Sequence, residues 1–487
     1  MTHIKSSTIC AIATPSGGAI GIIRVSGPEA IDITARLFVP AGKKSLQDKE
    51  GSSLTFGKII DPENDEIVDE VLVSLFRAPH SYTGEDSTEI SCHGSQYILS
   101  RVLQLLVHAG CQLAKPGEYT QRAFLNGKMD LSQAEAVADL IASSTAANHR
   151  MAMRQMRGGF SQELRELRDH LLHITSLLEL ELDFSDHEDL EFASRDELLS
   201  LSNLIHDRIN RLCRSFKLGN ALKRGIPVAI VGETNAGKST LLNALVGEQR
   251  ALVSNIHGTT RDTVEETVVV GGTLIRFIDT AGIRNTTDTV EQMGIERTYE
   301  KIEEADIVLW LIDSTVAREQ YDHLSKVFAD TDKHIVPILN KTDLLNEDEL
   351  SQLRHEFQSL FGQQTASTEV STSAHSTVSA TDVLYMSAHN MDDIDRLRVI
   401  LSDHLNALSA NLSTDSDLIV SNTRHYEALS HALTAIDRVT EGLHAGLSGD
   451  FVSQDLRECI YHLSDIAGEV TTDQVLGNIF KHFCVGK

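Results

Sequence analysis

The chain has 487 residues, of which 41% are hydrophobic and 23% are charged, a composition typical of a soluble protein with several buried cores. Its 43 Lys and Arg residues are outnumbered by 70 Asp and Glu residues, which gives a formal net charge of −27. This charge excludes broad binding to nucleic-acid phosphates and leaves only a local basic patch or a partner's surface for RNA contacts. At roughly 150 residues per domain, the length favours about three domains.

The sequence predicts a cytoplasmic protein with no segment that enters a membrane. Its longest apolar run, Ile307–Ile312, is far shorter than the roughly 20 residues that a membrane-spanning helix needs. The first residues lack the basic stretch and apolar segment of a secretory signal. The six cysteines have no CxxC spacing, which favours reduced thiols over a disulfide framework.

Residues 1–121 are predicted to form a mixed α+β domain. Short runs of strand-forming residues at Ile20–Val25, Val71–Phe76 and Thr88–Cys92 alternate with turns rich in Gly, Pro, Asp and Ser.

A helical pattern extends from Phe124 to about Phe216, so residues 122–221 are assigned to the first part of an all-α domain. The acidic stretch Asp183–Glu191 is expected to break these helices. The predicted buried face consists of Leu164, Leu167, Leu171, Thr175, Leu178 and Leu182. A group of arginines either forms a local RNA-binding patch or, as the favoured alternative, lies on a solvated helix face; these are Arg150, Arg154, Arg157, Arg165 and Arg168.

Residues 222–407 change to an alternation of strands and helices, with Gly271-Gly272 predicted to turn a hairpin. Residues 363–381 are rich in Ser and Thr and are expected to form a disordered surface insertion, with a regulatory site as the weaker alternative. The predicted strands are IPVAIVG (226–232), VEETVVV (264–270), TLIRFID (273–279), ADIVLWLID (305–313), HIVPILN (334–340) and VLYMSA (383–388).

Residues 408–487 resume the helical pattern and are assigned to the second part of the all-α domain. One stripe contains Tyr426, Leu429, Leu433, Ile436, Val439, Leu443 and Leu447, and another contains Leu456, Leu463 and Ile466. We therefore expect a multidomain α/β protein in which a Ras-like P-loop domain, with a mixed and mostly parallel sheet, is inserted into the helical domain. Three domains in series are the alternative.

GETNAGKS at 232–239 lies between a predicted strand and a predicted helix, which is the arrangement of a phosphate-binding loop. Lys238 is expected to reach the β- and γ-phosphates of a nucleotide, and Ser239 to ligate Mg²⁺. The nucleotide-contacting residues expected here are Asn235, Ala236, Gly237, Lys238, Ser239 and Thr240.

NKTD at 340–343 predicts that the base is guanine. The Asp343 carboxylate can accept hydrogen bonds from guanine N1–H and from its amino group, a pattern that adenine does not offer. Asn340 can meet the N7/O6 edge, and the stem of Lys341 can cover the ring. The expected contacts are Asn340, Lys341, Thr342, Asp343, Ser387 and Ala388. These motifs together predict GTP as the substrate.

DTAG at 279–282 predicts a second contact with Mg²⁺ and a sensor of the γ-phosphate, formed by Asp279, Thr280, Ala281 and Gly282. A hydroxyl from Thr260 can complete the Mg²⁺ shell only when the γ-phosphate is present, which makes a switch. Arg261 is either structural or, less favoured, an arginine finger. Ile283 stands where Ras-like switches place a water-orienting glutamine, so hydrolysis needs another group.

Nearly the whole chain resembles the bacterial tRNA-modification GTPase family called MnmE or TrmE. The resemblance is carried by GGAIGIIRVSG (17–27), SYTGEDSTEISCHG (81–94), KPGEYTQRAFLNGKMDLSQAEAVADLI (115–141), GTTRD (258–262) and FCVGK (483–487). It implies a homodimeric GTPase that works with an FAD-containing, MnmG-like subunit on the wobble uridine of certain tRNAs. The implied product is a 5-carboxymethylaminomethyl or aminomethyl group at C5 of the base.

The resemblance also implies hydrolysis that K⁺ stimulates and that depends on dimerisation of the GTPase domains. Asn235 would ligate K⁺ together with Ser254, Ile256 and Thr259, and the ion would supply the charge of an arginine finger. Glu291 matches the family's water-orienting glutamate. The loop around these ligands would contact the nucleotide through Ser254, Asn255, Ile256, His257, Gly258, Thr259 and Thr260.

For the N-terminal domain, the resemblance implies dimerisation and binding of 5-formyltetrahydrofolate or a related tetrahydrofolate. Arg24, Glu89, Lys128 and Lys487 match the family's folate-contacting positions. Cys484 matches a family cysteine with a proposed catalytic part in the modification, and an unreactive buried thiol is the alternative.

Two rival functions remain open at this point. A regulatory GTPase of ribosome assembly would share the nucleotide motifs but would be expected to carry a basic RNA-binding appendage. A folate enzyme such as an aminomethyltransferase, with the GTPase merely appended, would act on free amines without tRNA. The acidic balance and the FCVGK end favour tRNA modification over the first rival.

Overall fold

The computed structural model describes residues 7–15, 17–183, 194–247, 266–278, 302–328, 333–366, 383–410, 418–470, 473–481, 483, 484 and 486. The chain forms two compact units. The first contains Met1–Ile141, Ala152–Ile209 and Ala428–Lys487, and the second contains Ala142–Met151 and Asn210–Glu427. Among the described residues, every helix is too short or too polar to cross a membrane.

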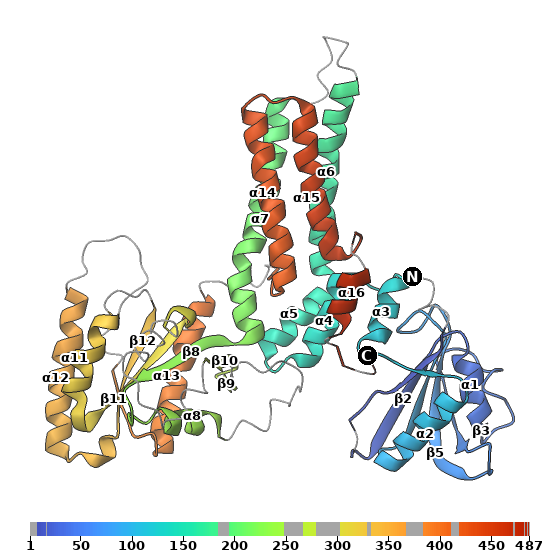
Figure 1. Cartoon of the computed structure of the whole chain (residues 1–487), viewed down its shortest axis with the longest axis horizontal. Helices are drawn as coiled ribbons and strands as arrows, with labels where there is room; N and C mark the ends of the chain where they lie inside the picture. The colour runs from blue at the N-terminus through green and yellow to red at the C-terminus, as the bar shows by residue number, and fades with distance from the viewer. Residues whose placement is uncertain are drawn as a thin grey trace. The chain divides into compact units, whose positions relative to one another are not determined.

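The first unit begins with a seven-stranded sheet in the order β3-β4-β5-β6-β2-β1-β7, antiparallel except where β1 pairs with β7 (Figure 1). The strands are β1 (Ile9–Ile12), β2 (Ile20–Ser26), β3 (Phe38–Pro40), β4 (Ser53–Ile60), β5 (Ile67–Phe76), β6 (Ser87–His93) and β7 (Gln112–Leu113). The three predicted strands in this region are confirmed as β2, β5 and β6, whereas β1, β3, β4 and β7 were not predicted.

Helices α1 (Ala30–Leu37) and α2 (Gln96–His108) bury their apolar faces on this sheet. Alternate residues of β5, such as Val71, Val73 and Leu75, face the same core. An antiparallel sheet packed on one side produces this period of two. The result is an α+β domain, as predicted.

The helices that follow begin with α3 (Glu118–Leu125), earlier than the expected start at Phe124. Gly117 adopts a left-handed conformation before α3, and the Glu118 carboxylate accepts a hydrogen bond from Lys115 N, which favours an early start. The remaining helices before the second unit's sheet are α4 (Leu131–Ala142), α5 (Ala146–Met156), α6 (Gly159–Asp183) and α7 (Arg195–Arg224). The described part of α6 reaches Asp183, and 184–191, the rest of the acidic stretch predicted to break the helices, lie outside the described residues.

Two helices from the end of the chain complete the bundle of the first unit (Figure 1). Helix α15 (Gly449–Ala467) packs along α6, and α14 (Thr423–His444) contacts α7, where the Ser202 and Thr440 hydroxyls are 2.7 Å apart. Helix α16 (Asp473–Phe480) packs on α3. The helices before and after the sheet of the second unit therefore share one helical domain.

The buried stripes of this bundle match the predicted ones in their middle. Leu456, Leu463 and Ile466 are buried, as are Leu429, Ile436, Val439 and Leu443. The two ends of the first stripe are wrong: Tyr426 is 36% exposed, and Leu447 lies beyond the end of α14 and is 46% exposed. Tyr426 lies near the start of α14, where its ring stacks on Phe216 with centroids 4.3 Å apart and is partly open to solvent.

The second unit has a six-stranded sheet in the order β13-β12-β11-β8-β10-β9, parallel except for the β9–β10 pair. Its strands are β8 (Ile226–Gly232), β9 (Glu266–Val270), β10 (Thr273–Phe277), β11 (Ile307–Asp313), β12 (His334–Asn340) and β13 (Leu384–Tyr385). All six predicted strands are therefore confirmed. Gly271 and Gly272 turn the predicted hairpin with φ values of 56° and 82°.

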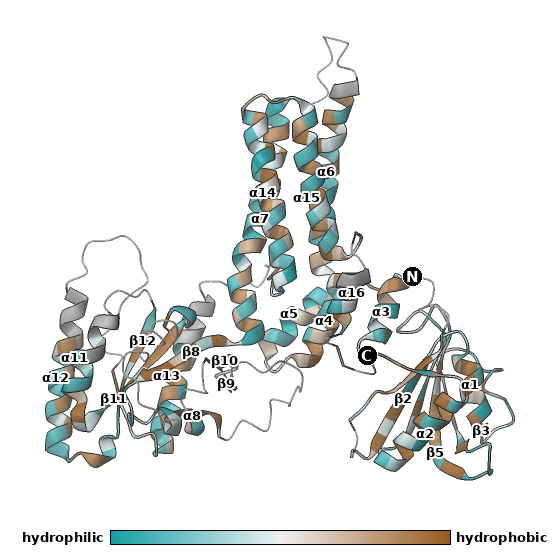
Figure 2. Cartoon of the chain, in the orientation of Figure 1, coloured by the Kyte–Doolittle hydropathy of each residue, from teal (hydrophilic) through white to brown (hydrophobic). Residues whose placement is uncertain are grey.

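Helices cover both faces of this sheet. Helices α8 (Lys238–Val246) and α13 (Met391–Ala410) share one core with it, and α11 (Ala317–Phe328) and α12 (Glu347–Ala366) share the other. Its central strands β8, β11 and β12 are correspondingly apolar along most of their length (Figure 2). Because α12 runs to Ala366, the first residues of the predicted Ser/Thr-rich insertion are helical, and 367–381 lie outside the described residues.

Candidate functional site

The phosphate-binding loop connects β8 to α8, as the sequence predicted. Asn235 and Gly237 both have positive φ values, 65° and 99°, so the chain turns sharply before the helix begins at Lys238. Backbone N–H groups at a helix N-terminus, preceded by such a turn, form a concave site for an anion. The structure thus provides the cradle that a nucleotide phosphate needs.

The Lys238 side chain folds back across this loop. Its Nζ donates to Gly232 O at 2.6 Å and to Glu233 O at 2.8 Å. A phosphate would offer the ammonium a full negative charge in addition to these carbonyl dipoles, and charge-assisted hydrogen bonds are the stronger kind. Lys238 is therefore in position to contribute a cation to an anion bound in the loop.

Asn340 joins three segments that are far apart in sequence. Its side chain is 2% exposed, donates from Nδ2 to Ala236 O at 2.8 Å, and accepts at Oδ1 from Ala388 N at 2.9 Å. The buried amide thus holds the phosphate-binding loop, the NKTD segment and the Ser387-Ala388 turn together. These are the three described parts of the predicted guanine nucleotide site.

Lys341 and Asp343 come just after Asn340 in the NKTD segment. Lys341 has a left-handed backbone with φ 65°, and its Nζ lies 2.6 Å from Asp313 Oδ2 at the end of β11. Burial tends to raise the pKa of Asp313, but hydrogen bonds from Lys341 and Thr315 outweigh it and leave the pKa lowered. Asp343 forms no ion pair with another described residue. It is exposed in the short helix η2 (Thr342–Leu344).

Only part of the predicted metal sites lies within the described residues. Ser239, at the start of α8, is the described member of the Mg²⁺ set, and Asn235 is the described member of the K⁺ set. A hydroxyl oxygen and an amide oxygen suit these hard cations. The described residues contain no group of three or more His, Cys, Asp or Glu side chains placed to hold a metal. The other predicted ligands, Thr260 for Mg²⁺ and Ser254, Ile256 and Thr259 for K⁺, lie outside the described residues.

The other predicted nucleotide residues lie outside the described ranges. They are Ser254, Asn255, Ile256, His257, Gly258, Thr259, Thr260, Asp279, Thr280, Ala281, Gly282 and Glu291. Thr240 is half-buried in α8, and Thr342 donates its backbone N–H to Met386 O at 3.3 Å.

A second candidate site lies in the first unit around Arg24. Arg24 on β2 and Glu89 on β6 are paired across the sheet, with Arg24 Nη2 2.7 Å from Glu89 Oε1. The guanidinium also lies over two rings, 5.7 Å from the Tyr82 centroid and 5.6 Å from that of Tyr119. Tyr119 OH in turn donates to Arg24 O. The predicted folate residues Arg24 and Glu89 are therefore brought together.

The end of the chain reaches the same place. Arg24 Nη1 donates to Gly486 O at 3.3 Å, and Gly117 N donates to Cys484 O at 3.3 Å. Cys484 is exposed, so the alternative of a buried thiol is wrong. Lys487 lies outside the described residues. Lys128 contacts a different segment, because its Nζ donates to Pro79 O at 3.0 Å.

Sequence reasoning missed several residues of these sites. Asp313 closes a predicted parallel strand next to the NKTD strand, and polar residues at such carboxyl ends commonly line ligand sites, so strand order could have revealed it. Tyr82 and Tyr119 stand in segments used for the resemblance but were given no role. The contact of Gly486 with Arg24 joins residues 462 positions apart, which no local pattern could reveal.

Two family models match the chain. Residues 131–484 match the MnmE helical domain, and residues 8–128 match the GTP-binding protein TrmE N-terminus. A tRNA modification GTPase MnmE of Bacteroides fragilis is 57% identical over 489 residues, covering 99% of this chain and 100% of the relative. Proteins of the same name from Bacteroides thetaiotaomicron and Porphyromonas gingivalis are 57% and 47% identical, covering 99% of this chain and 100% and 98% of the relatives.

Proposed function

Because the chain belongs to the MnmE family of tRNA modification GTPases, we propose that it binds GTP with Mg²⁺ and hydrolyses it as part of tRNA modification. The observation that supports this most directly is the buried Asn340 amide, which ties the phosphate-binding loop to the guanine-selecting segment. Such a link favours a site that recognises base and phosphates of one molecule at once.

In this proposal the described residues divide the work. Lys238 places a positive charge against the β- and γ-phosphates, and Ser239 contributes its hydroxyl to Mg²⁺. Asp343 accepts the two guanine hydrogen bonds that distinguish this base. Mg²⁺, when bound, would supply positive charge that offsets the negative charge developing on the phosphates. Thr260 and the DTAG residues are assigned to the same nucleotide site from their sequence motifs alone.

Hydrolysis needs a substitute for the glutamine that Ile283 replaces. We assign the orientation of the attacking water to Glu291 and the extra positive charge to a K⁺ held by Asn235, Ser254, Ile256 and Thr259. A cation beside the phosphates lowers the barrier in the same way as an arginine finger, whose contribution is roughly 10³–10⁵ in rate. Two copies of the chain would face each other during this step.

The modification chemistry is assigned to the Arg24 region and to partners. Arg24, Glu89, Lys128 and Lys487 would bind 5-formyltetrahydrofolate or a related tetrahydrofolate, whose one-carbon unit enters the C5 substituent of the wobble uridine. Cys484 is exposed and held by its backbone to Gly117, in the segment that contacts Arg24. An FAD-containing, MnmG-like subunit and tRNA would be the other components.

Steady-state GTP hydrolysis by the full chain in K⁺ and in Na⁺ tests the ion assignment. Wild type should be at least about tenfold faster in K⁺, and Asn235→Ala should lose that difference. Asn243→Ala, an exposed change on α8, is the matched control and should keep it. Equal wild-type rates in both salts would overturn the K⁺ site while leaving GTP hydrolysis in place.

A further inference from the structure

Lys341, whose side-chain stem would cover the guanine ring, forms an ion pair with the carboxylate of Asp313. Lys341 Nζ lies 2.6 Å from Asp313 Oδ2, and the two side chains are 29% and 11% exposed. Surface ion pairs gain little because water screens them, but a pair this far buried is screened much less. This contact therefore restrains the Lys341 side chain more strongly than an ordinary surface pair would.

Asp313 is itself fixed in place. Its Oδ1 accepts from Thr315 N at 3.0 Å and from Thr315 Oγ1 at 2.7 Å, and its own N–H donates to Gln320 Oε1 at 2.8 Å. Gln320 is 5% exposed, so this support comes from the interior. Both carboxylate oxygens are thus committed, one to the turn after β11 and one to Lys341.

The sheet sets the two residues side by side. Asp313 is the last residue of β11 and pairs in parallel register with Asn340, the last residue of β12 and the neighbour of Lys341. Lys341 follows with a left-handed backbone, which is unfavourable for a non-glycine residue. A strained backbone and an anchored terminal amine leave little freedom to the stem between them.

We propose that Asp313 is a positioning residue for the nucleotide base. It holds the ammonium of Lys341 so that the methylene stem stays extended as a platform for one face of guanine before the nucleotide arrives. Binding then loses little side-chain entropy at Lys341, which lowers the free-energy cost of association. This inference rests on the proposed GTP site, and it adds a residue that touches neither base nor phosphate.

The test measures fluorescent mant-GDP binding to the full chain by stopped flow. Asp313→Asn removes the charge and keeps the shape, and we expect affinity to fall roughly tenfold, mainly through faster dissociation, which corresponds to about 1.4 kcal/mol. Asp322→Asn is the matched control, because this exposed residue on α11 pairs with Arg318 and not with Lys341. It should bind as wild type does.

Two further measurements separate positioning from a general structural role. Inosine diphosphate shares the ring face of GDP but lacks the 2-amino group, so Asp313→Asn should weaken both ligands by the same factor. Lys341→Met keeps most of the stem and removes the charge. If Asp313 acts through Lys341, adding Asp313→Asn to Lys341→Met should change the dissociation constant less than twofold, even where thermal melting shows that Asp313→Asn alone is less stable.

The outcomes are distinct. Full affinity in a folded Asp313→Asn variant, or equal losses in the wild-type and Lys341→Met backgrounds, would overturn the positioning role and leave the GTPase assignment intact. Failure of the wild-type chain to bind mant-GDP at all would overturn both.

Discussion

At the scale of single residues, Gly237 shows why the phosphate-binding loop tolerates so little change. Its φ is 99°, and a Cβ at this position would collide with Nδ2 of Asn340, the amide that ties the loop to the base site. Gly237→Ala should therefore weaken mant-GDP binding by roughly tenfold or more, about 1.4 kcal/mol, because Asn340 must move. Equilibrium titration of the full chain measures this loss.

Gly272 provides the control for backbone strain. It also has a positive φ, 82°, but a Cβ there would meet nothing within 4 Å. Gly272→Ala should lower stability by about 1–2 kcal/mol without changing nucleotide affinity. If Gly237→Ala bound as well as Gly272→Ala, the collision with Asn340 could not be what makes glycine necessary.

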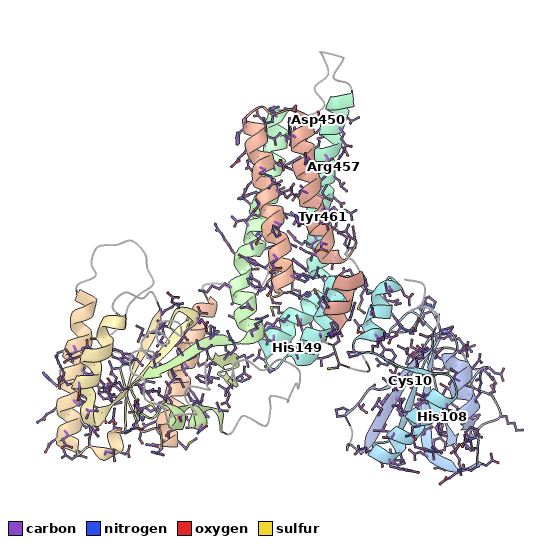
Figure 3. All side chains as sticks on the ribbon, viewed as in Figure 1. Cys10, His108, His149, Asp450, Arg457 and Tyr461 are labelled. Atoms are coloured by element: carbon purple, nitrogen blue, oxygen red, sulfur yellow. The ribbon has the colours of Figure 1, made fainter. Side chains whose placement is uncertain are left out.

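The cysteines should differ sharply in reactivity. Cys484 is exposed, whereas burial raises the pKa of Cys92 to about 11 and that of Cys459 to about 12. Since the thiolate is the nucleophile, a disulfide reagent at pH 7.5 should label Cys484 first. Cys10 lies within the N-terminal domain (Figure 3) and should react only on unfolding.

Loss of the fast phase in Cys484→Ser, followed by mass spectrometry of the labelled peptides, checks this order. A fast phase that persisted in Cys484→Ser would contradict this order, because it would come from the half-buried Cys213 or from a buried thiol.

Residue roles could be read from the sequence where a short motif imposes its own chemistry. Lys238, Ser239 and Asn340 were predicted in this way, because each stands in a motif of fixed spacing, and their nucleotide and metal roles stay predictions. Asp313 and Tyr119 escaped because their partners, Lys341 and Arg24, lie in segments distant in the sequence. Such contacts depend on the fold and leave no signature in the sequence next to either residue.

At the scale of elements, the contact of α6 with α15 holds the two halves of the helical domain together. Leu171 on α6 is fully buried, as is Leu456 on α15. Leu171→Ala should lower the free energy of unfolding by about 2–5 kcal/mol through the cavity it leaves. Urea denaturation followed by circular dichroism measures the shift, and mant-GDP affinity should not change, because the nucleotide site lies in the other compact unit.

Arg457 on α15 (Figure 3) joins the same two helices at their surface and not in their core. Its side chain is 68% exposed and pairs with Glu179 on α6, so Arg457→Ala should cost less than about 1 kcal/mol. Equal effects of Leu171→Ala and Arg457→Ala would mean that surface pairing, and not the apolar core, joins the two helices.

Burial and length together made a strand predictable, since the four-residue β1 is mostly buried but was not predicted. The central strands of the second unit stand out because a parallel sheet covered on both faces reads as continuous apolar runs, as in β11. In the first unit, β4 escaped because it is buried on one side only and exposes Leu54 and Phe56 on the other. The predicted bundle stripe failed at Tyr426 and Leu447, near the two ends of α14, and Leu433 in its middle is only half-buried.

At the scale of the whole molecule, one chain joins a nucleotide unit to a unit whose Arg24 region contacts the end of the chain. The net charge of −27 argues that tRNA is not held by general attraction to this protein. We expect the MnmG-like subunit to supply most of the RNA-binding surface. At constant K⁺, adding NaCl should therefore weaken tRNA binding to the complex far more than it affects GTP hydrolysis by the isolated chain. Filter binding measures the first effect, and phosphate release measures the second.

The central claim is that GTP hydrolysis by this chain serves modification of the tRNA wobble uridine. Nucleoside mass spectrometry of bulk tRNA from a strain lacking the gene tests it most directly. Loss of the C5 aminomethyl-type substituent, restored by the wild-type gene and not by Lys238→Ala, is the predicted result. Unchanged nucleosides in the deletion strain would contradict the account and favour a regulatory GTPase of ribosome assembly.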